Sequence, residues 1–286
     1  MNNIYLLQDR KDRLGSNFMI QLGDFIFCKI KNLELYYSTQ HKYKKNIYFI
    51  PIIKNSQENT SNYKSNICCY PGVRGSSANC VEILNQDIIS YFQVNYKEYF
   101  FNIIKKELKK NKFILPWSDN KKIISIHIRL EDVSSRKDYN GQGSFNYIKN
   151  LIENKQFSKY NRADSDKHSL DTQAPIDPKK LIDLIEKFQK EYPEKEIYII
   201  TYCEVIPEWL DKIVNEYKIH IYHKNNEDYD LWLMIHSDIL VLSKSTYSIM
   251  AGIYHQGSQV YYPYWGVNAS LGLGSKYDKS GWIGYV

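Results

Sequence analysis

Between residues 121 and 265, short apolar runs alternate with segments that have helical periodicity. The runs IISIHI, IYIITY and DILVLS are rich in β-branched residues, which is typical of strands buried on both faces, and SQVYYPY is expected to be the last strand. One intervening helix is expected to begin at Asp177 and Pro178, an N-cap followed by a first-turn proline. Alternating strands and helices form a parallel sheet with helices on both faces, so this part predicts a doubly wound, Rossmann-like unit.

The preceding part of the chain predicts a second unit of the same class. A strand from Ile4 to Leu7 is followed by a polar loop, by apolar residues at helical spacing up to Ile30, and by the strand LELYYS. The turn-rich stretch PWSDNKK, residues 116–122, is the expected boundary. A chain of 286 residues has room for two lobes, so we predict an α/β protein with domains 1–118 and 119–286, each built on a parallel sheet.

Composition narrows the function only slightly. The net charge of +6 allows an anionic partner, but the basic residues are spread among helices, so we do not expect a nucleic-acid-binding stripe. The five cysteines show no zinc-type spacing. The apolar run at the amino terminus is too short for a signal-peptide core or a membrane span, which favours a cytoplasmic protein.

Charged residues gather where the run IISIHI ends. His127 is the penultimate residue of the run, and Arg129, Glu131 and Asp132 follow it. In open parallel sheets ligands bind at the carboxyl ends of the strands, and a guanidinium offers a planar fork of donors to a phosphate group. Arg129 could equally form a structural ion pair with one of the two acids. His127 shares its face and is either a proton acceptor or a packed, hydrogen-bonded core residue.

Two further segments reach the same expected edge. DILVLS leads through Lys244 into Ser245 and Thr246, where a helix is expected to begin. A helix start binds anions through its N–H groups and its dipole, although the two hydroxyl residues could simply cap the helix. The run IYIITY ends just before Cys203 and Glu204.

Four segments, in this order, resemble motifs of the fucosyltransferase superfamily, and most of all its α1,2 family. DRLGSN resembles the motif G-[GR]-L-G-N-Q, and HIRLED resembles H-x-R-R-x-D. YCEVIPEW resembles a strand that ends in two acids before a tryptophan-containing helix, and KSTYS resembles N-S-[ST]-F-S. The resemblance covers residues 4–32 and 121–265.

The resemblance implies a GT-B fold, in which two Rossmann-like lobes enclose a cleft. It implies an inverting, metal-independent transferase that uses GDP-L-fucose, needs no cofactor, and binds the nucleotide sugar in the second lobe and a glycan acceptor beside the first. The implied catalytic residues are Arg129, which contacts the diphosphate, and Asp132, Glu131 and His127. The implied donor-binding residues are Arg13, Gly15, Asn17, Arg129, Glu204, Lys244, Ser245, Thr246, Tyr247 and Ser248.

One departure from the motifs leaves the donor open. Leu130 stands where the family has a second arginine, so the chain could use another nucleotide sugar, react slowly, or employ Lys244 or Arg13 as a substitute. Asp132 is the first candidate for the base that accepts the acceptor's proton, ahead of Glu131, Glu204 and His127, although Asp132 could equally orient Arg129 or His127. A non-catalytic homologue that binds nucleotides or glycans is a further alternative.

A metal site is not expected. D-x-D sequences, which hold a metal in other glycosyltransferases, occur at residues 164–166 and 228–230. The first has no strand before it, and the second opens a helix, where acids stabilise the helix dipole.

Overall fold

The computed structural model describes residues 4–7, 14–30, 32, 34–37, 54–55, 88–111, 113–118, 122–130, 175–265 and 281–285. The chain divides into two compact units. The first unit comprises residues 1–112 and 269–280, and the second comprises residues 113–268 and 281–286. The predicted roles of the two lobes, and the cleft between them, stay predictions.

The first unit has a three-stranded parallel sheet and three described helices. Its strands β1 (Ile4–Leu7), β2 (Glu34–Tyr37) and β3 (Lys54–Asn55) lie in that order. Helix α1 (Leu14–Ile30) joins β1 to β2, and α3 (Ile88–Asn95) and α4 (Lys97–Asn111) follow. Phe25, Phe92 and Phe100 pack between the helices, with the rings of Phe92 and Phe100 stacked at 5.3 Å.

The second unit has a six-stranded, all-parallel sheet in the order β6-β5-β4-β7-β8-β9. In chain order its elements are β4 (Ile123–Ile128), α7 (Pro178–Glu191), β5 (Glu196–Thr201), α8 (Glu208–Tyr217), β6 (His220–Tyr222), α9 (Glu227–Ile235), β7 (Ile239–Val241), α10 (Thr246–Tyr254), β8 (Gln259–Pro263) and β9 (Ile283–Tyr285).

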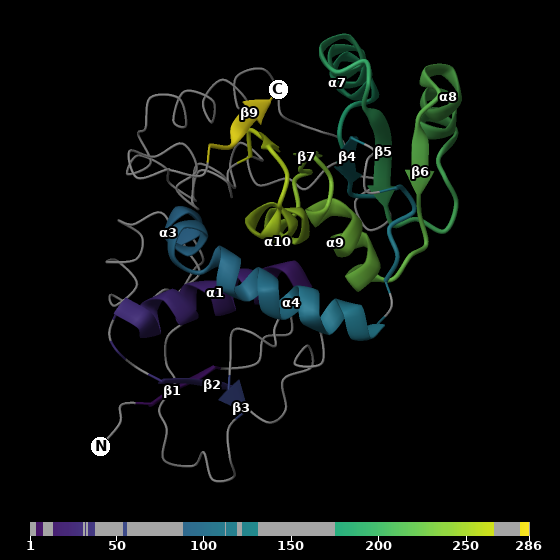
Figure 1. Ribbon diagram of the computed structural model, residues 1–286. Coiled ribbons are helices and arrows are strands. Elements are labelled where there is room, and N and C mark those ends of the chain that lie inside the picture. Colours follow the sequence, from purple (N-terminus) through teal and green to yellow (C-terminus); the bar gives the residue numbers. More distant parts are fainter. Residues whose placement is uncertain are drawn as a thin grey trace. The chain divides into compact units, whose positions relative to one another are not determined.

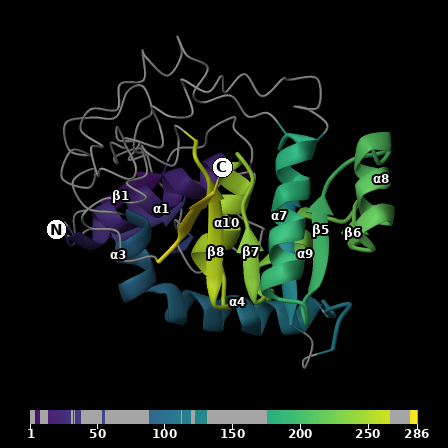
Figure 2. The same cartoon turned by 90° about the horizontal axis from the view of Figure 1, so that it is seen from above.

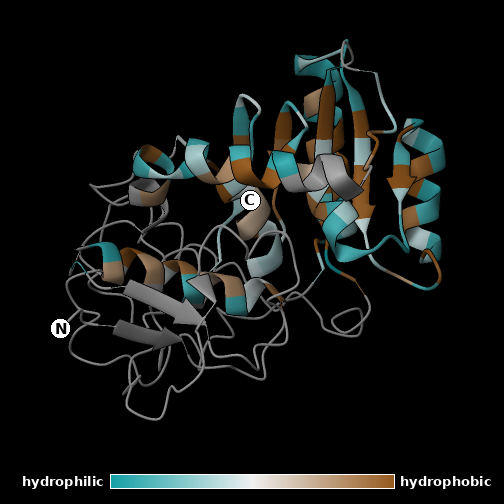
Figure 3. Cartoon of the chain, turned by 60° about the horizontal axis from the view of Figure 1, so that its bottom comes forward, coloured by the Kyte–Doolittle hydropathy of each residue, from teal (hydrophilic) through white to brown (hydrophobic). Residues whose placement is uncertain are grey.

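Helices cover both faces of this sheet. Helices α7 and α8 lie on one face, and α9 and α10 lie on the other (Figures 1 and 2). Alternate residues of β4, Ile124, Ile126 and Ile128, belong to the apolar cluster under α7 and α8, so His127 faces the layer of α9 and α10. The strands are predominantly hydrophobic, as expected for strands covered on both sides (Figure 3).

The structure confirms the α/β class with parallel sheets in both units, and it adds the strands β3 and β9. SQVYYPY, expected to be the last strand, is followed by β9, which pairs with β8. The sequence IGY is too short to show a strand pattern of its own, so β9 depends on its partner. In the part of the chain that the structure describes, no helix combines the length and apolarity needed to cross a membrane.

Candidate functional site

The topology of the larger sheet marks one position on its edge. From β4, the connection through α7 leads to β5 on one side, whereas β7 and then β8 lie on the other side. The connections therefore diverge between β4 and β7, which is the topological switch point where open parallel sheets bind ligands. Arg129 leaves β4 at this point, and Ser243 to Ser245 leave β7 there.

A buried hydrogen bond joins the two strand ends. His127 Nδ1 lies 2.7 Å from Ser243 Oγ, across 116 residues of sequence. Burial, and secondly the positive charge of Arg129, lower the pKa of His127 to about 3. The imidazole is therefore neutral at neutral pH. Of the two roles expected for His127, this geometry favours the hydrogen-bonded core residue over the proton acceptor. The half-buried Arg129 lies close enough to His127 to lower the pKa of the imidazole.

Hydroxyl groups shape the start of α10. Ser245 is its N-cap and accepts a hydrogen bond from the backbone N–H of Tyr247 at 3.3 Å. The Ser248 hydroxyl accepts from the backbone N–H of Ser243 at 3.2 Å and donates to the Ser245 carbonyl at 2.9 Å. The loop between β7 and α10 is thus closed by its own side chains. Ser245 caps the helix, and this role is compatible with an anion at the same helix start.

Tyr247 connects the start of α10 to the start of α9 and to His127. Its ring lies 5.7 Å from the ring of His127, and its hydroxyl donates to the carbonyl of Glu227 in the first turn of α9. Lys244, half-buried, sits between Ser243 and the cap. The first turns of α9 and α10 are therefore held together beside the end of β4.

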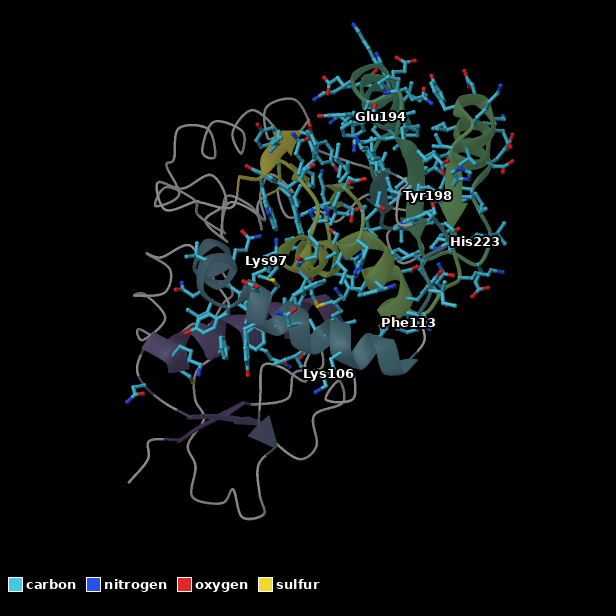
Figure 4. The ribbon with its side chains drawn as sticks, in the orientation of Figure 1. Lys97, Lys106, Phe113, Glu194, Tyr198 and His223 are labelled. Atoms are coloured by element: carbon cyan, nitrogen blue, oxygen red, sulfur yellow. The ribbon has the colours of Figure 1, made fainter. Side chains whose placement is uncertain are left out.

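Glu204 lies at the same edge, one strand away from β4. It follows β5, is exposed, and pairs with Lys224 at 3.3 Å. His223, which is labelled after β6 in Figure 4, places its Nδ1 3.4 Å from the carbonyl of Cys203. These contacts join the loops that follow β5 and β6.

The remaining predicted site residues do not all fall on described parts of the chain. Gly15 and Asn17 are buried in the first turn of α1, in the first unit. Arg13, Glu131 and Asp132 lie outside the described residues. The structure therefore brings together His127, Arg129 and residues 244–248, and it adds Ser243. Sequence reasoning missed Ser243 because a lone serine after a strand carries no signal until its partner is known.

The acids of the segment 228–230 stand in the first turn of α9. Asp230 is buried and accepts a hydrogen bond from Asn225 Nδ2 at 2.8 Å. Burial raises its pKa to about 7, against the smaller opposite effect of that hydrogen bond. Among the described residues, no group of three or more His, Cys, Asp or Glu side chains could hold a metal ion. The segment 164–166 lies outside them.

Comparison with known proteins gives matches only among solved structures. No model of a known protein family matches the chain, and no curated protein matches it. The chain superposes on POFUT1 in complex with GDP-fucose with a TM-score of 0.42 and 11% identity, over 91% of this chain and 97% of that chain. It superposes on the NodZ α-1,6-fucosyltransferase soaked with GDP-fucose with a TM-score of 0.40 and 9% identity, over 91% of this chain and 94% of that chain.

Fucosyltransferase NodZ from Bradyrhizobium gives a TM-score of 0.41 and 9% identity, over 88% of this chain and 92% of that chain. Identities of 9–11% are too low to assign the chain to the family of any of these proteins.

Proposed function

We propose that the protein is a glycosyltransferase of the fucosyltransferase superfamily, most similar to the α1,2 family. It transfers L-fucose from GDP-fucose to a hydroxyl of a glycan acceptor with inversion at the anomeric carbon. One observation carries the proposal: His127, the first residue of HIRLED, bonds to Ser243, the residue just before KSTYS, so the two motif-like segments begin side by side at the topological switch point of a parallel sheet.

The proposed chemistry requires positive charge at the leaving group. As the sugar departs, negative charge grows on the diphosphate, and a preorganised donor there lowers the barrier by about 3–4 kcal/mol. Arg129 is the proposed donor, assisted by the start of α10 and its dipole. Lys244, which follows Ser243 directly, is the proposed replacement for the family's second arginine, with Arg13 as the other candidate.

The proton of the acceptor hydroxyl needs a base. Asp132 remains the first candidate, with Glu131 and Glu204 behind it. His127 is a poor base because its pKa is lowered to about 3. We assign it a positioning role, in which the neutral ring holds Ser243 beside Arg129.

A second donor is favoured by one feature. Leu130, at the position of the family's second arginine, is buried in the apolar cluster under α7 and α8, on the sheet face opposite to His127. The end of β4 therefore contributes one cation and not two. A different nucleotide sugar as donor, or a homologue that binds nucleotide without turnover, would fit this arrangement.

A thermal-shift panel with GDP, UDP, ADP and their sugars tests the proposal. Selective stabilisation by GDP is expected, amounting to about 2.7 kcal/mol at 100 times the dissociation constant. Arg129→Ala should weaken GDP binding by about 10- to 100-fold, the range for a hydrogen bond to a charged group. Lys190→Ala, which removes an exposed charge from α7, is the matched control.

Turnover is measured by release of GDP from GDP-fucose in the presence of a glycan library. Selective binding of UDP would move the proposal to another donor, and GDP binding without turnover would favour the non-catalytic homologue. Equal binding of GDP by wild type and Arg129→Ala would remove the basis of the proposal. Lys244→Ala tests the replacement: unchanged turnover and affinity would exclude it.

A further inference from the structure

Strand β9 is the part of the second unit that no sequence pattern indicated. Residues 281–286, which include β9, belong to the second unit. There β9 adds to the edge of the sheet, parallel to β8, with Tyr285 opposite Pro263 (yellow in Figure 1). The contacts that β9 and its flanking residues make with α10 and with the loop after β7 indicate a role beyond extending the sheet.

The space around two glycines, Gly252 and Gly284, shows how closely β9 and the residue before it pack against their neighbours. A Cβ atom on Gly252 of α10 would lie 2.8 Å from the ring of Trp282, just before β9. A Cβ atom on Gly284 would lie 2.7 Å from the ring of Tyr264, just after β8. The strand is therefore packed against α10 and against the end of β8, with no room for another methyl group at either contact.

The hydroxyl of Tyr285 reaches the loop that forms the candidate site. It donates to the carbonyl of Leu242 at 2.6 Å. The N–H of Ser243 belongs to the same peptide group as that carbonyl, and it donates to Ser248 Oγ at 3.2 Å. Tyr285 and Ser248 thus hold this one peptide group from its two sides. A rotation of the group would break both bonds and would carry with it Ser243, the partner of His127.

We infer that β9 is a latch that holds residues 243–248 in the conformation that binds the anionic group, with Tyr285 as the positioning residue. The identity of that group, a nucleoside diphosphate, rests on the proposed function. Tyr285 itself contacts the backbone and needs no contact with the ligand. Its loss leaves the buried Leu242 carbonyl without this donor and frees the peptide group to rotate.

The test compares Tyr285→Phe with Tyr192→Phe. Both variants lose only a hydroxyl from a half-buried ring, and the Tyr192 hydroxyl bonds to Gln259 at the amino end of β8, 3.2 Å away. Two quantities are measured: hydrogen exchange of the amides of residues 243–248, and the dissociation constant for GDP. In Tyr285→Phe we expect exchange about fivefold faster and GDP binding about fivefold weaker, the ratio set by one ordinary hydrogen bond. Tyr192→Phe should change neither.

Gly284→Ala is a second, independent perturbation. Its methyl group meets the Tyr264 ring and should displace β9, with the same two effects. If both variants keep the exchange rates of the control at residues 243–248, there is no latch. Faster exchange with unchanged GDP affinity would also overturn the inference, since the segment would then not be held for the ligand. If wild type binds no GDP or other nucleotide, the proposed function fails, and the exchange rates alone decide whether β9 holds the segment.

Discussion

Replacing Asp230 by asparagine should stabilise the second unit at alkaline pH and leave it nearly unchanged in acid. Asp230 is buried in α9, and its one hydrogen-bond donor among the described residues, Asn225, is neutral. Burial without a cation penalises the carboxylate, so the pKa rises to about 7. An asparagine of the same shape still accepts from Asn225 through its Oδ1 and never has to ionise.

The size of the effect follows from linkage. The pKa of an aspartate in an unfolded chain is about 3.9, roughly three units lower than in the folded protein. Between these values the unfolded chain has lost the proton and the folded protein has kept it, so stability falls by about 1.4 kcal/mol per pH unit as the pH rises. Asp230→Asn should therefore gain up to about 4 kcal/mol at about pH 8, and under about 1 kcal/mol at about pH 4.

Tryptophan fluorescence during urea unfolding is suited to this measurement. All five tryptophans, Trp117, Trp209, Trp232, Trp265 and Trp282, belong to the second unit, so the signal reports on that unit. The denaturant slope should be unchanged, because the variant alters a charge and not the surface exposed. Asp211→Asn, at an exposed acid of α8, is the control. If Asp230→Asn raised the free energy of unfolding equally at about pH 4 and about pH 8, or lowered it at about pH 8, Asp230 would have no raised pKa.

Three further substitutions have defined outcomes. Because the pKa of His127 is lowered to about 3 in the folded protein, stability is lost as the pH falls from about 6.5 towards 3. In this range the unfolded chain binds a proton at this histidine and the folded protein does not. His127→Asn should therefore remove the uptake of about one proton on acid unfolding, measured by the pH dependence of the urea midpoint. Gly257→Ala should cost about 1–3 kcal/mol in the same assay, because its Cβ would lie 2.3 Å from the backbone carbonyl of Asp238; an unchanged midpoint would refute the contact. Asp177→Ala should cost about 1 kcal/mol, because it removes the cap that accepts from the Lys179 N–H at 2.9 Å; Asp177→Asn, which can still cap, should lose much less.

The elements with strong local signals could be predicted from sequence. The strands β4, β5 and β7 are apolar runs that need burial on both faces, and α7 begins at Pro178 with Asp177 as its cap, as expected. At α8 the proline has a different place: Pro207 is the N-cap without a side-chain bond, and the helix begins one residue later at Glu208. Local chemistry places an element well and its end less well.

The features that depend on distant partners could not be predicted in the same way. Asp230 was expected to stabilise a helix dipole, and only the packing of α9 shows that it is buried. Ser243 matters because of His127, and β9 exists because β8 offers it an edge. Arg129 and residues 244–248 were found from their motifs and from the rule for strand ends. Which of them act on a substrate stays a prediction.

The switch point also sets when the site can form during folding. The strands β4 and β7 are neighbours in the sheet, yet their paired residues Ile124 and Ile239 are separated by more than a hundred positions in the chain. Closing so long a loop is expected late in folding, after the helices and the pairing of β7 with β8 have formed. Refolding protein should therefore recover its helical circular dichroism before it can capture a ligand, and the interval between the two measures how long the central pairing takes.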